Sequence, residues 1–274
     1  MYNHLTKPLV IIKRNIDEVD SDGFSVITIG TFDGVHLGHR KIISKLVSSA
    51  RANDFRSTIL TFFPHPRMVL QQDDSLKLIN TIDEKISILE KLGLDQLVIH
   101  PFTKDFSRLS AMEYVRDILV KKLNARKIII GYDHRFGRNR TATIKELREF
   151  AETFNFEVEE ITAEEINEVS VSSTKIRKAL ETGDIQKANS YLGYEYMLTG
   201  IITKGKGLGR QLEFPTANLH IEETYKLIPQ NGVYVVKSIL DNKTVFGMMN
   251  IGVNPTVGGR KKTLKIPLFK KFKK

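Results

Sequence analysis

The sequence predicts an α/β fold, with a doubly wound parallel-sheet domain followed by a small, incomplete antiparallel β-barrel domain. Between residues 24 and 162, short apolar runs typical of buried strands alternate with segments of helical periodicity. After about residue 195, β-rich runs separated by turns replace the helices. We therefore expect a first domain over residues 1–187 and a second over residues 195–274.

The first domain is expected to contain a series of strands and helices. Its strands are predicted at residues 26–29, 57–63, 97–99, 127–130 and 156–161, and its helices at residues 40–52, 83–92, 111–123 and 144–154. Three of these helices follow the capping-box signature, Ser or Thr with Glu three residues later: Thr81 with Glu84, Ser110 with Glu113, and Thr143 with Glu146. Because connecting helices cover both faces of a parallel sheet, ligands are expected at the carboxyl ends of its strands.

The second domain is expected to consist of short antiparallel strands. They are predicted at residues 196–202, 232–239 and 244–251. Asp241 and Asn242 lie between the last two runs and form a turn signal. The two runs therefore predict a β-hairpin.

Composition limits the possible classes of protein. The 274 residues are 41% hydrophobic and include no cysteine, so we expect no disulfides and no thiolate metal site, and a cytoplasmic location fits best. The net charge of +10 comes largely from residues 260–274, which hold eight Lys and Arg and no acid. The first 259 residues hold 34 basic and 32 acidic residues, so no specific nucleic-acid partner is expected. No apolar run is long enough to cross a membrane, and the oligomeric state is left open.

The most informative segment is Gly-Thr-Phe-Asp-Gly-Val-His-Leu-Gly-His, residues 30–39, between a predicted strand and a predicted helix. Glycines allow a close approach of the backbone to a ligand, and the free N–H groups at a helix start favour an anion. The imidazoles of His36 and His39 can donate to phosphate oxygens. This combination predicts a site for a nucleotide triphosphate. Its binding residues are predicted to be Gly30, Thr31, Phe32, Asp33 and Gly38.

Loops after two other strands carry candidate binding residues. Asp133, in an arginine-rich loop after the Ile-rich strand, either holds a polar ligand group or lies in a solvated loop. Phe63 and His65 lie in the sequence Phe-Phe-Pro-His-Pro, whose phenylalanines either fill the core or stack on a flat ligand. Both readings stay open for each loop.

The segment Ser-Ser-Thr-Lys-Ile-Arg, residues 172–177, opens a predicted helix. Ser and Thr are ordinary N-cap residues, so the segment is either a capped surface helix or an anion site. For an anion site, the candidate residues are the hydroxyls of Ser172, Ser173 and Thr174 together with Lys175 and Arg177.

A glycine-rich loop in the second domain is a further candidate phosphate site. Its predicted binding residues are Gly205, Gly207, Gly209 and Arg210. The sequence Phe-Pro-Thr-Ala-Asn follows, and Thr216 and Asn218 offer oxygen ligands suited to magnesium. The alternative is a flexible hairpin loop followed by a turn.

These motifs occur together, and in this order, in the bacterial bifunctional riboflavin kinase/FAD synthetase family, which the chain resembles over residues 10–259. The resemblance rests on residues 30–39, on Phe-Phe-Pro-His-Pro, Gly-Tyr-Asp-His-Arg-Phe-Gly, Ser-Ser-Thr-Lys-Ile-Arg and Phe-Pro-Thr-Ala-Asn, and on Gly-Met-Met-Asn-Ile-Gly. It implies a nucleotidyltransferase domain that joins the adenylyl group of ATP to FMN with release of pyrophosphate, helped by Mg²⁺. It also implies a riboflavin kinase domain that makes FMN from riboflavin and ATP.

The resemblance implies roles for individual residues. In the first domain, His36 and His39 would stabilise charge on the ATP phosphates and Arg177 would hold the triphosphate with Ser173 and Thr174, while Asp133 and the Phe63 loop would lie beside the flavin. In the second domain, Thr216 and Asn218 would bind metal and phosphate. His134 stands where the family usually has an aromatic residue.

The ending departs from the family pattern. No Asp or Glu follows Asp241, and the lysine-rich end resembles a truncation or a shifted reading frame. We therefore expect an impaired kinase that lacks a carboxylate base, in a loosely ordered domain with residues 260–274 mobile. Two alternatives remain: another His-x-Gly-His nucleotidyltransferase, such as a cytidylyltransferase, or a regulatory protein that binds flavin or nucleotide.

Overall fold

The structure, a computed structural model, describes residues 10–20, 22–73, 75–167, 171–203, 216–240, 243–253 and 262–267. The chain divides into two compact units, each described below by itself. The first consists of residues 1–173 and 191–193, and the second of residues 174–190 and 194–274. The predicted domain limits at residues 187 and 195 remain a prediction.

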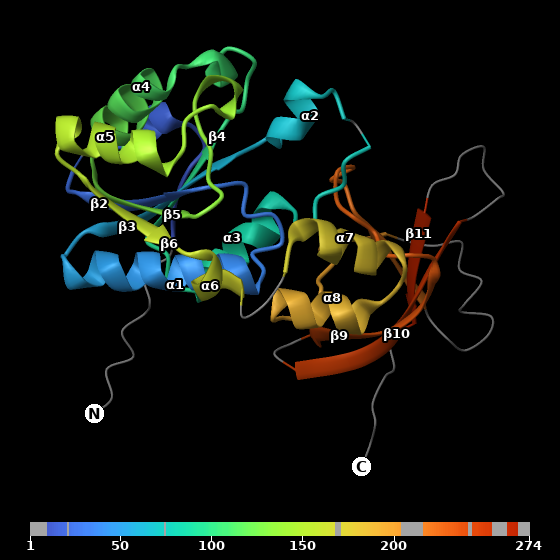
Figure 1. Cartoon of the computed structure of the whole chain (residues 1–274). Helices are drawn as coiled ribbons and strands as arrows, with labels where there is room; N and C mark the ends of the chain where they lie inside the picture. Colours follow the sequence, from blue (N-terminus) through green and yellow to red (C-terminus); the bar gives the residue numbers. More distant parts are fainter. Residues whose placement is uncertain are drawn as a thin grey trace, which may run out of the picture. The chain divides into compact units, whose positions relative to one another are not determined.

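The first unit contains a six-stranded sheet of parallel strands in the order β1-β4-β3-β2-β5-β6 (Figure 1). The strands are β1 (Ile11–Lys13), β2 (Ser25–Ile29), β3 (Arg56–Phe62), β4 (Gln96–His100), β5 (Ala125–Gly131) and β6 (Glu157–Ile161). The predicted doubly wound parallel sheet is confirmed. From β2 the chain adds β3 and then β4 on one side, and β5 and β6 on the other. The direction of winding therefore reverses between β2 and β5, and ligands bind at such a point in doubly wound sheets.

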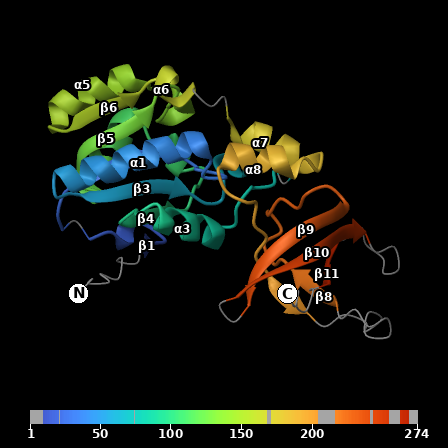
Figure 2. The same ribbon diagram turned by 90° about the horizontal axis from the view of Figure 1, so that it is seen from below.

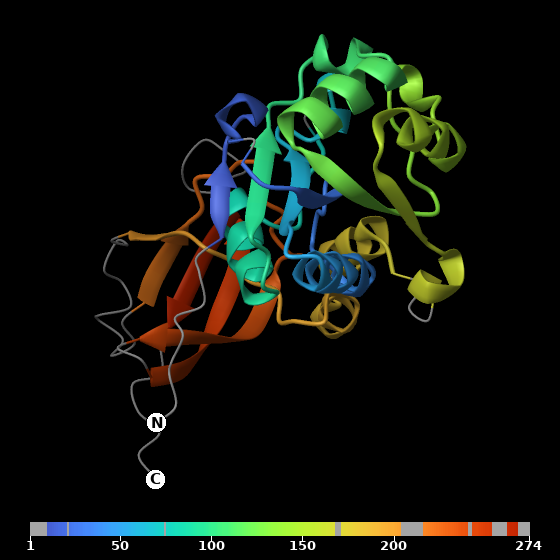
Figure 3. The ribbon, with the colours of Figure 1, turned by 90° about the vertical axis from the view of Figure 1, so that its left-hand side faces the viewer.

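Helices cover both faces of this sheet. The helical segments are η1 (Ile16–Glu18), α1 (Leu37–Ala52), α2 (Pro66–Leu70), α3 (Ile82–Lys91), η2 (Phe106–Arg108), α4 (Ala111–Glu113), the π-helix η3 (Tyr114–Lys122), η4 (Arg138–Arg140), α5 (Ile144–Phe154) and α6 (Ala163–Asn167). Helices α1 and α3 lie on one face, and α4 and α5 on the other (Figures 1 and 3). All three predicted capping boxes are formed. The helix predicted at residues 111–123 is instead one α-helical turn followed by η3.

Apolar residues on both faces explain why the sheet forms. All five residues of β2 are buried, because the strand lies at the centre of the sheet between two covered faces. Towards η3 and α5, Ile27 and Ile128 pack with Val115, Leu119 and Leu147 in one apolar cluster. Strand β2 therefore ends in a fixed position, which in turn fixes the start of the loop that follows it.

The second unit contains most of α7 (Ser173–Glu181), α8 (Ile185–Leu192) and a five-stranded antiparallel sheet (Figure 2). The strands are β7 (Ile201–Thr203), β8 (Thr216–His220), β9 (Gly232–Leu240), β10 (Lys243–Val253) and β11 (Lys262–Pro267), in the order β7-β8-β11-β10-β9. The predicted hairpin is confirmed, since Leu240 of β9 pairs with Lys243 of β10. In the described part of the chain the sheet is not closed, and β7 and β9 are its edges.

Two expectations for this unit are wrong. Residues 262–267 are not part of a mobile tail: they form β11, which pairs with both β8 and β10. The reason is the alternation of apolar and basic residues, which leaves Leu264 5% exposed and Lys265 exposed. The strand predicted at residues 196–202 is shorter than expected, because the structure has only β7, Ile201–Thr203, in this region. At the predicted start, the backbone N–H of Tyr196 donates to Asn189 Oδ1 (2.8 Å) instead of to a neighbouring strand.

Candidate active site

The loop from β2 to α1 places both histidines at the start of a 16-residue helix. His36 is the N-cap residue of α1, and its Nδ1 accepts a hydrogen bond from the backbone N–H of His39 (3.4 Å). An N-cap imidazole satisfies one of the N–H groups that lack partners at a helix start. The helix therefore holds the His36 ring in place and directs its positive end toward the loop.

The backbone of this loop is strained. Phe32 and Val35 have positive φ values of 45° and 37°, which are uncommon for residues with side chains and rare for a β-branched one. Gly34 between them has a φ of 86°. A Cβ at Gly34 would lie 2.9 Å from Ile79 Cδ1, which is closer than carbon atoms approach in proteins. Strain of this kind persists only where the surrounding structure enforces it, and it occurs often at functional sites.

We predict that Gly34→Ala destabilises the first unit. A strained backbone conformation usually costs about 1 to 3 kcal/mol, and the close contact of the new Cβ with Ile79 adds to this cost. Gly23→Ala is the matched control. Gly23 has a similar φ of 81°, but nothing lies within 4 Å of a Cβ built there. Urea denaturation of both variants measures the difference, and equal losses of stability would show that the contact with Ile79 has no effect.

The two imidazoles are neutral at pH 7. Burial lowers the pKa of His36 to about 4 and brings the pKa of His39 well below its usual range. The rings are stacked, with centroids 3.6 Å apart and an angle of 17° between their planes, an arrangement that two imidazolium cations would resist. Because His36 Nδ1 is an acceptor, the proton of the neutral ring is on Nε2. His36 can therefore donate one hydrogen bond through Nε2–H.

Hydrogen bonds fix the rest of the turn. The buried carboxylate of Asp33 accepts from the backbone N–H of Ile79 (2.9 Å), and the Ser173 hydroxyl donates to the backbone carbonyl of Asp33 (2.9 Å). The ring edge of Phe32 contacts His39, with centroids 5.1 Å apart. The side chain of Asp33, which was predicted to bind the ligand, thus holds the loop in place. The hydroxyl proton of Ser173 is already donated to the backbone carbonyl of Asp33.

Sequence reasoning missed Lys85, which lies in the first turn of α3. Its side chain is buried, and its Nζ donates to the backbone carbonyl of Thr31 (2.7 Å). Burial lowers its pKa to about 8, and the nearby Asp33 opposes the shift. A signal was available, because a lysine is unfavourable near the positive end of a helix and its presence there calls for another role.

The loops after β3 and β5 begin beside this turn, since both strands are parallel neighbours of β2 in the sheet. After β5, Asp133 is exposed, and the loop is closed by backbone hydrogen bonds in both directions between Phe136 and Ala142 (3.0 and 3.2 Å). Burial lowers the pKa of His134 in this loop to about 4. Position and exposure leave Asp133 available to a ligand.

The structure distinguishes the two phenylalanines after β3. Phe62 packs against the rings of Phe102 and Phe106, with centroids 5.5 and 5.4 Å away, and so belongs to the apolar core. Phe63 is half-buried and lies outside that cluster. His65 is the N-cap of α2, where its Nδ1 accepts from Arg67 N–H (3.1 Å). Of these, Phe63 remains a candidate for contact with a flat ligand.

The remaining predicted residues belong to other elements. Arg177 is one helical turn after Ser173 on α7, with Thr174 and Lys175 exposed on the same helix. Residues 205, 207, 209 and 210 lie outside the described residues. Thr216 and Asn218 are both in β8; the Asn218 side chain is half-buried, and its backbone carbonyl accepts from the Thr203 hydroxyl (3.4 Å).

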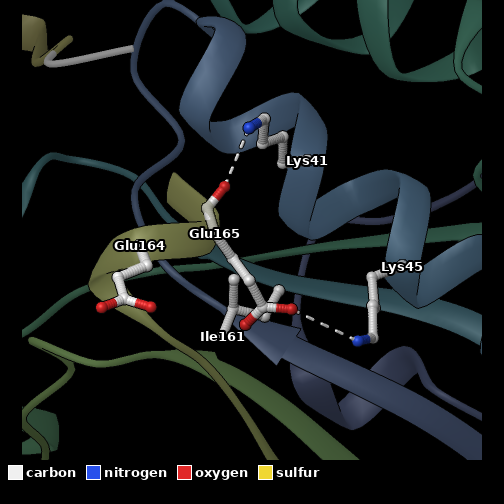
Figure 4. A pocket seen from close by; sticks show the side chains of 5 residues that line it. All are labelled: Lys41, Lys45, Ile161, Glu164 and Glu165. Carbon is white, nitrogen blue, oxygen red and sulfur yellow. Dashed lines mark hydrogen bonds and ion pairs between the residues drawn. The ribbon is translucent and has the colours of Figure 1, made fainter. Parts of the chain in front are cut away.

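A surface hollow beside α1 has a structural role. Lys41 and Lys45 of α1 line it together with Ile161, Glu164 and Glu165 (Figure 4). Lys41 donates to the backbone carbonyl of Glu165 (2.9 Å), and Lys45 pairs with Glu159 (2.6 Å) and Glu165 (3.7 Å). These contacts fix α6 against α1, so the basic side chains of the hollow are already paired.

Taken together, the first unit has the features of a nucleotide-binding enzyme of the α/β class. A strained turn at the switch point of a parallel sheet presents a neutral imidazole donor at the N-terminus of a long helix. No helix in the described ranges is both long and apolar enough to span a membrane.

Comparisons with known proteins agree on the family. The FAD synthetase family model matches residues 19–175, and the riboflavin kinase model matches residues 192–273. The chain belongs to the bifunctional riboflavin kinase/FMN adenylyltransferase family. The second match extends beyond residue 259, where the resemblance was expected to stop.

Similar proteins cover most of the chain. Bifunctional riboflavin kinase/FMN adenylyltransferases from Buchnera aphidicola (Schizaphis graminum), Bacillus subtilis and Escherichia coli K12 are 38%, 34% and 31% identical to it. They cover 93%, 92% and 93% of this chain, which spans 82%, 78% and 81% of theirs. A crystal structure described as a macrolide-efflux protein from Streptococcus pneumoniae is 27% identical, with a TM-score of 0.85, over 97% of this chain and 86% of that one.

Proposed function

We propose that the first domain transfers the adenylyl group of ATP to FMN. A phosphate oxygen of FMN attacks the α-phosphorus of ATP, the bond from that phosphorus to the oxygen bridging to the β-phosphate breaks, and pyrophosphate leaves with that oxygen. The observation that carries the proposal is the pair of stacked, neutral histidines at the start of α1.

The residues of the turn account for the catalysis that such a transfer needs. Nucleotidyl transfer depends mainly on positioning and on stabilising charge that develops on phosphate oxygens. The Nε2–H of His36 and the positive end of α1 both favour a negative group in front of the turn. Both imidazoles have already lost their second proton near pH 7 and keep the remaining N–H. Their capacity to donate a hydrogen bond therefore does not change in that range.

Mg²⁺ enters this proposal as part of the substrate Mg·ATP. Among the described residues there is no group of three or more His, Cys, Asp or Glu side chains placed to hold a metal. Magnesium at phosphoryl-transfer sites is bound largely by substrate phosphates and water. In the second domain, we propose Thr216 and Asn218 as oxygen ligands of the metal and phosphate, with the loop of Gly205, Gly207, Gly209 and Arg210 around the phosphates.

An assay of the purified chain with FMN and Mg·ATP tests the proposal. FAD and pyrophosphate should form together, and flavin fluorescence should fall because the adenine of FAD stacks on the flavin ring. An ATP analogue with a methylene group between the α- and β-phosphates is the control, because its bond cannot break. Flavin binding without ATP-dependent quenching would instead support the regulatory binding protein.

Arg177→Ala should raise the KM for ATP about tenfold or more and leave the KM for FMN nearly unchanged. A guanidinium one turn from Ser173 at a helix start is suited to phosphate, not to a flavin ring. Lys178→Ala, an exposed cation next to it on the same helix, is the matched control. A change in the KM for FMN alone would refute the assignment of Arg177 to the triphosphate.

Riboflavin phosphorylation is the second activity of the family. The comparisons give no support to an impaired kinase, since the riboflavin kinase model matches residues 192–273. Weak activity remains a prediction that depends on the lack of Asp and Glu in residues 242–274. Incubation of the chain with riboflavin and Mg·ATP, followed by chromatography of the flavins, measures it. FMN produced as fast as FAD would show that another carboxylate, such as Glu213, serves as base.

A further inference from the structure

We infer that Lys85 is a positioning residue of the nucleotide site: its buried ammonium holds the backbone of the histidine turn and supplies a positive charge near His39. The inference rests on the proposed function and deepens it. Lys85 is a buried cation that belongs to none of the sequence motifs. Its helix, α3, carries none of the predicted site residues.

The geometry ties Lys85 to the turn. Its side chain is 4% exposed, and its Nζ is 2.7 Å from the carbonyl oxygen of Thr31, the second residue of the motif. The same carbonyl accepts from the hydroxyl of Thr61 on β3 (3.2 Å). Two donors from different elements therefore hold one carbonyl group of the turn. The residues after it, Phe32 and Val35, have the strained backbone that such contacts must enforce.

The electrostatics explain why a cation is needed there. Both imidazoles are neutral near pH 7, so they contribute donors but no net charge. Lys85 keeps its charge, because its pKa of about 8 is above neutral pH. The charged and titratable groups that act on this site are Asp33 of the turn and His36 and His39 of α1. On its own helix, the neighbouring Glu84 carboxylate is engaged with the N–H of Thr81.

One buried atom connects Lys85 to the histidines. His39 Nδ1 is buried and has no hydrogen-bond partner among the described residues, and the charge of Lys85 contributes to the low pKa of that ring. Buried nitrogen atoms without partners are rare and costly. The ammonium thus adds to the effect of burial in keeping His39 neutral. A buried charge of this kind stabilises phosphate without being displaced by it.

The test compares Lys85→Met with Lys85→Arg, and uses Lys91→Met, an exposed lysine of the same helix, as the matched control. Lys85→Met should lower kcat for FAD formation at least about tenfold, with the KM for FMN nearly unchanged. Lys85→Arg should restore a large part of kcat. In the wild type, kcat should fall as pH rises through about 8, and this limb should be absent from the pH profile of Lys85→Arg.

A second readout does not depend on activity. Hydrogen exchange of the backbone amides of residues 31–39 should be faster in Lys85→Met than in Lys91→Met. If the wild type makes no FAD, the proposed function fails, while exchange still decides whether Lys85 holds the turn. Equal exchange in both variants, a kcat of Lys85→Met equal to that of the control, or an unchanged alkaline limb in Lys85→Arg would overturn the inference. Should Lys85→Met not fold, the pH profile of Lys85→Arg carries the test.

Discussion

Replacing His36 or His39 by alanine should lower the turnover of FAD formation about a hundredfold or more. This is the usual effect of removing a preorganised donor to a developing negative charge. The two rings are stacked 3.6 Å apart, so removal of either also releases the other from its position. Steady-state kinetics with FMN and Mg·ATP measure the effect, and the double variant should lose little more than the worse single variant.

The N-cap role of His36 needs a separate control. His36→Ala removes both the side chain that caps α1 and the Nε2–H donor, and loss of an N-cap alone costs about 1 kcal/mol of stability. His36→Asn keeps a good N-cap. If His36→Asn were as active as the wild type, the histidine would serve only as a cap. Full activity in the double alanine variant would refute the active-site assignment.

Acid should destabilise the first unit well before its carboxylates are protonated. An unfolded chain binds protons at its histidines near pH 6.5, whereas folded His36 does so only near pH 4. Between these values the unfolded state binds more protons, so the free energy of unfolding rises with pH and levels off above about 6.5. The shift of His36 corresponds to about 3 kcal/mol at the acid end of this window. Burial lowers the pKa of His39 and His134 as well, so they act in the same direction.

Urea denaturation from about pH 4 to pH 7 measures this dependence. The variant His36→Asn with His39→Gln is the matched control, because it removes two of the groups and keeps polar side chains of similar size. Its free energy of unfolding should vary less with pH than that of the wild type. Equal slopes for both proteins would mean that these histidines are not held neutral by burial.

Local signals predicted much of the first unit. The capping boxes at Thr81, Ser110 and Thr143 each consist of residues three positions apart, so sequence alone identifies them. The position of the histidine turn followed from a β-branched strand and a helical pattern on either side. Helix α5 was predicted with the bounds that the structure shows.

Features that depend on distant contacts were missed. Lys85 is part of the site because α3 packs beside the turn, and the hydrogen bond that places it there joins residues 54 positions apart in the chain. The roles of Asp33 and Ser173 in holding the loop depend on Ile79 and on each other, residues far apart in the chain. Strand β11 was missed because its charge outweighed the alternation of Leu264 with Lys265, and only the pairing with β8 and β10 shows it as a strand.

The place of β11 has a consequence for synthesis on the ribosome. Among the described strands of the second sheet it is the last to be made, yet it lies in the middle, between β8 and β10. Until residues 262–267 leave the exit tunnel, the other described strands can form only two separate pairs, β7 with β8 and β9 with β10. Isolated pairs of strands are marginally stable in water. The described strands of the second sheet can therefore assemble only after residue 267 has been translated, whereas every described strand of the first sheet is available from residue 161 onward.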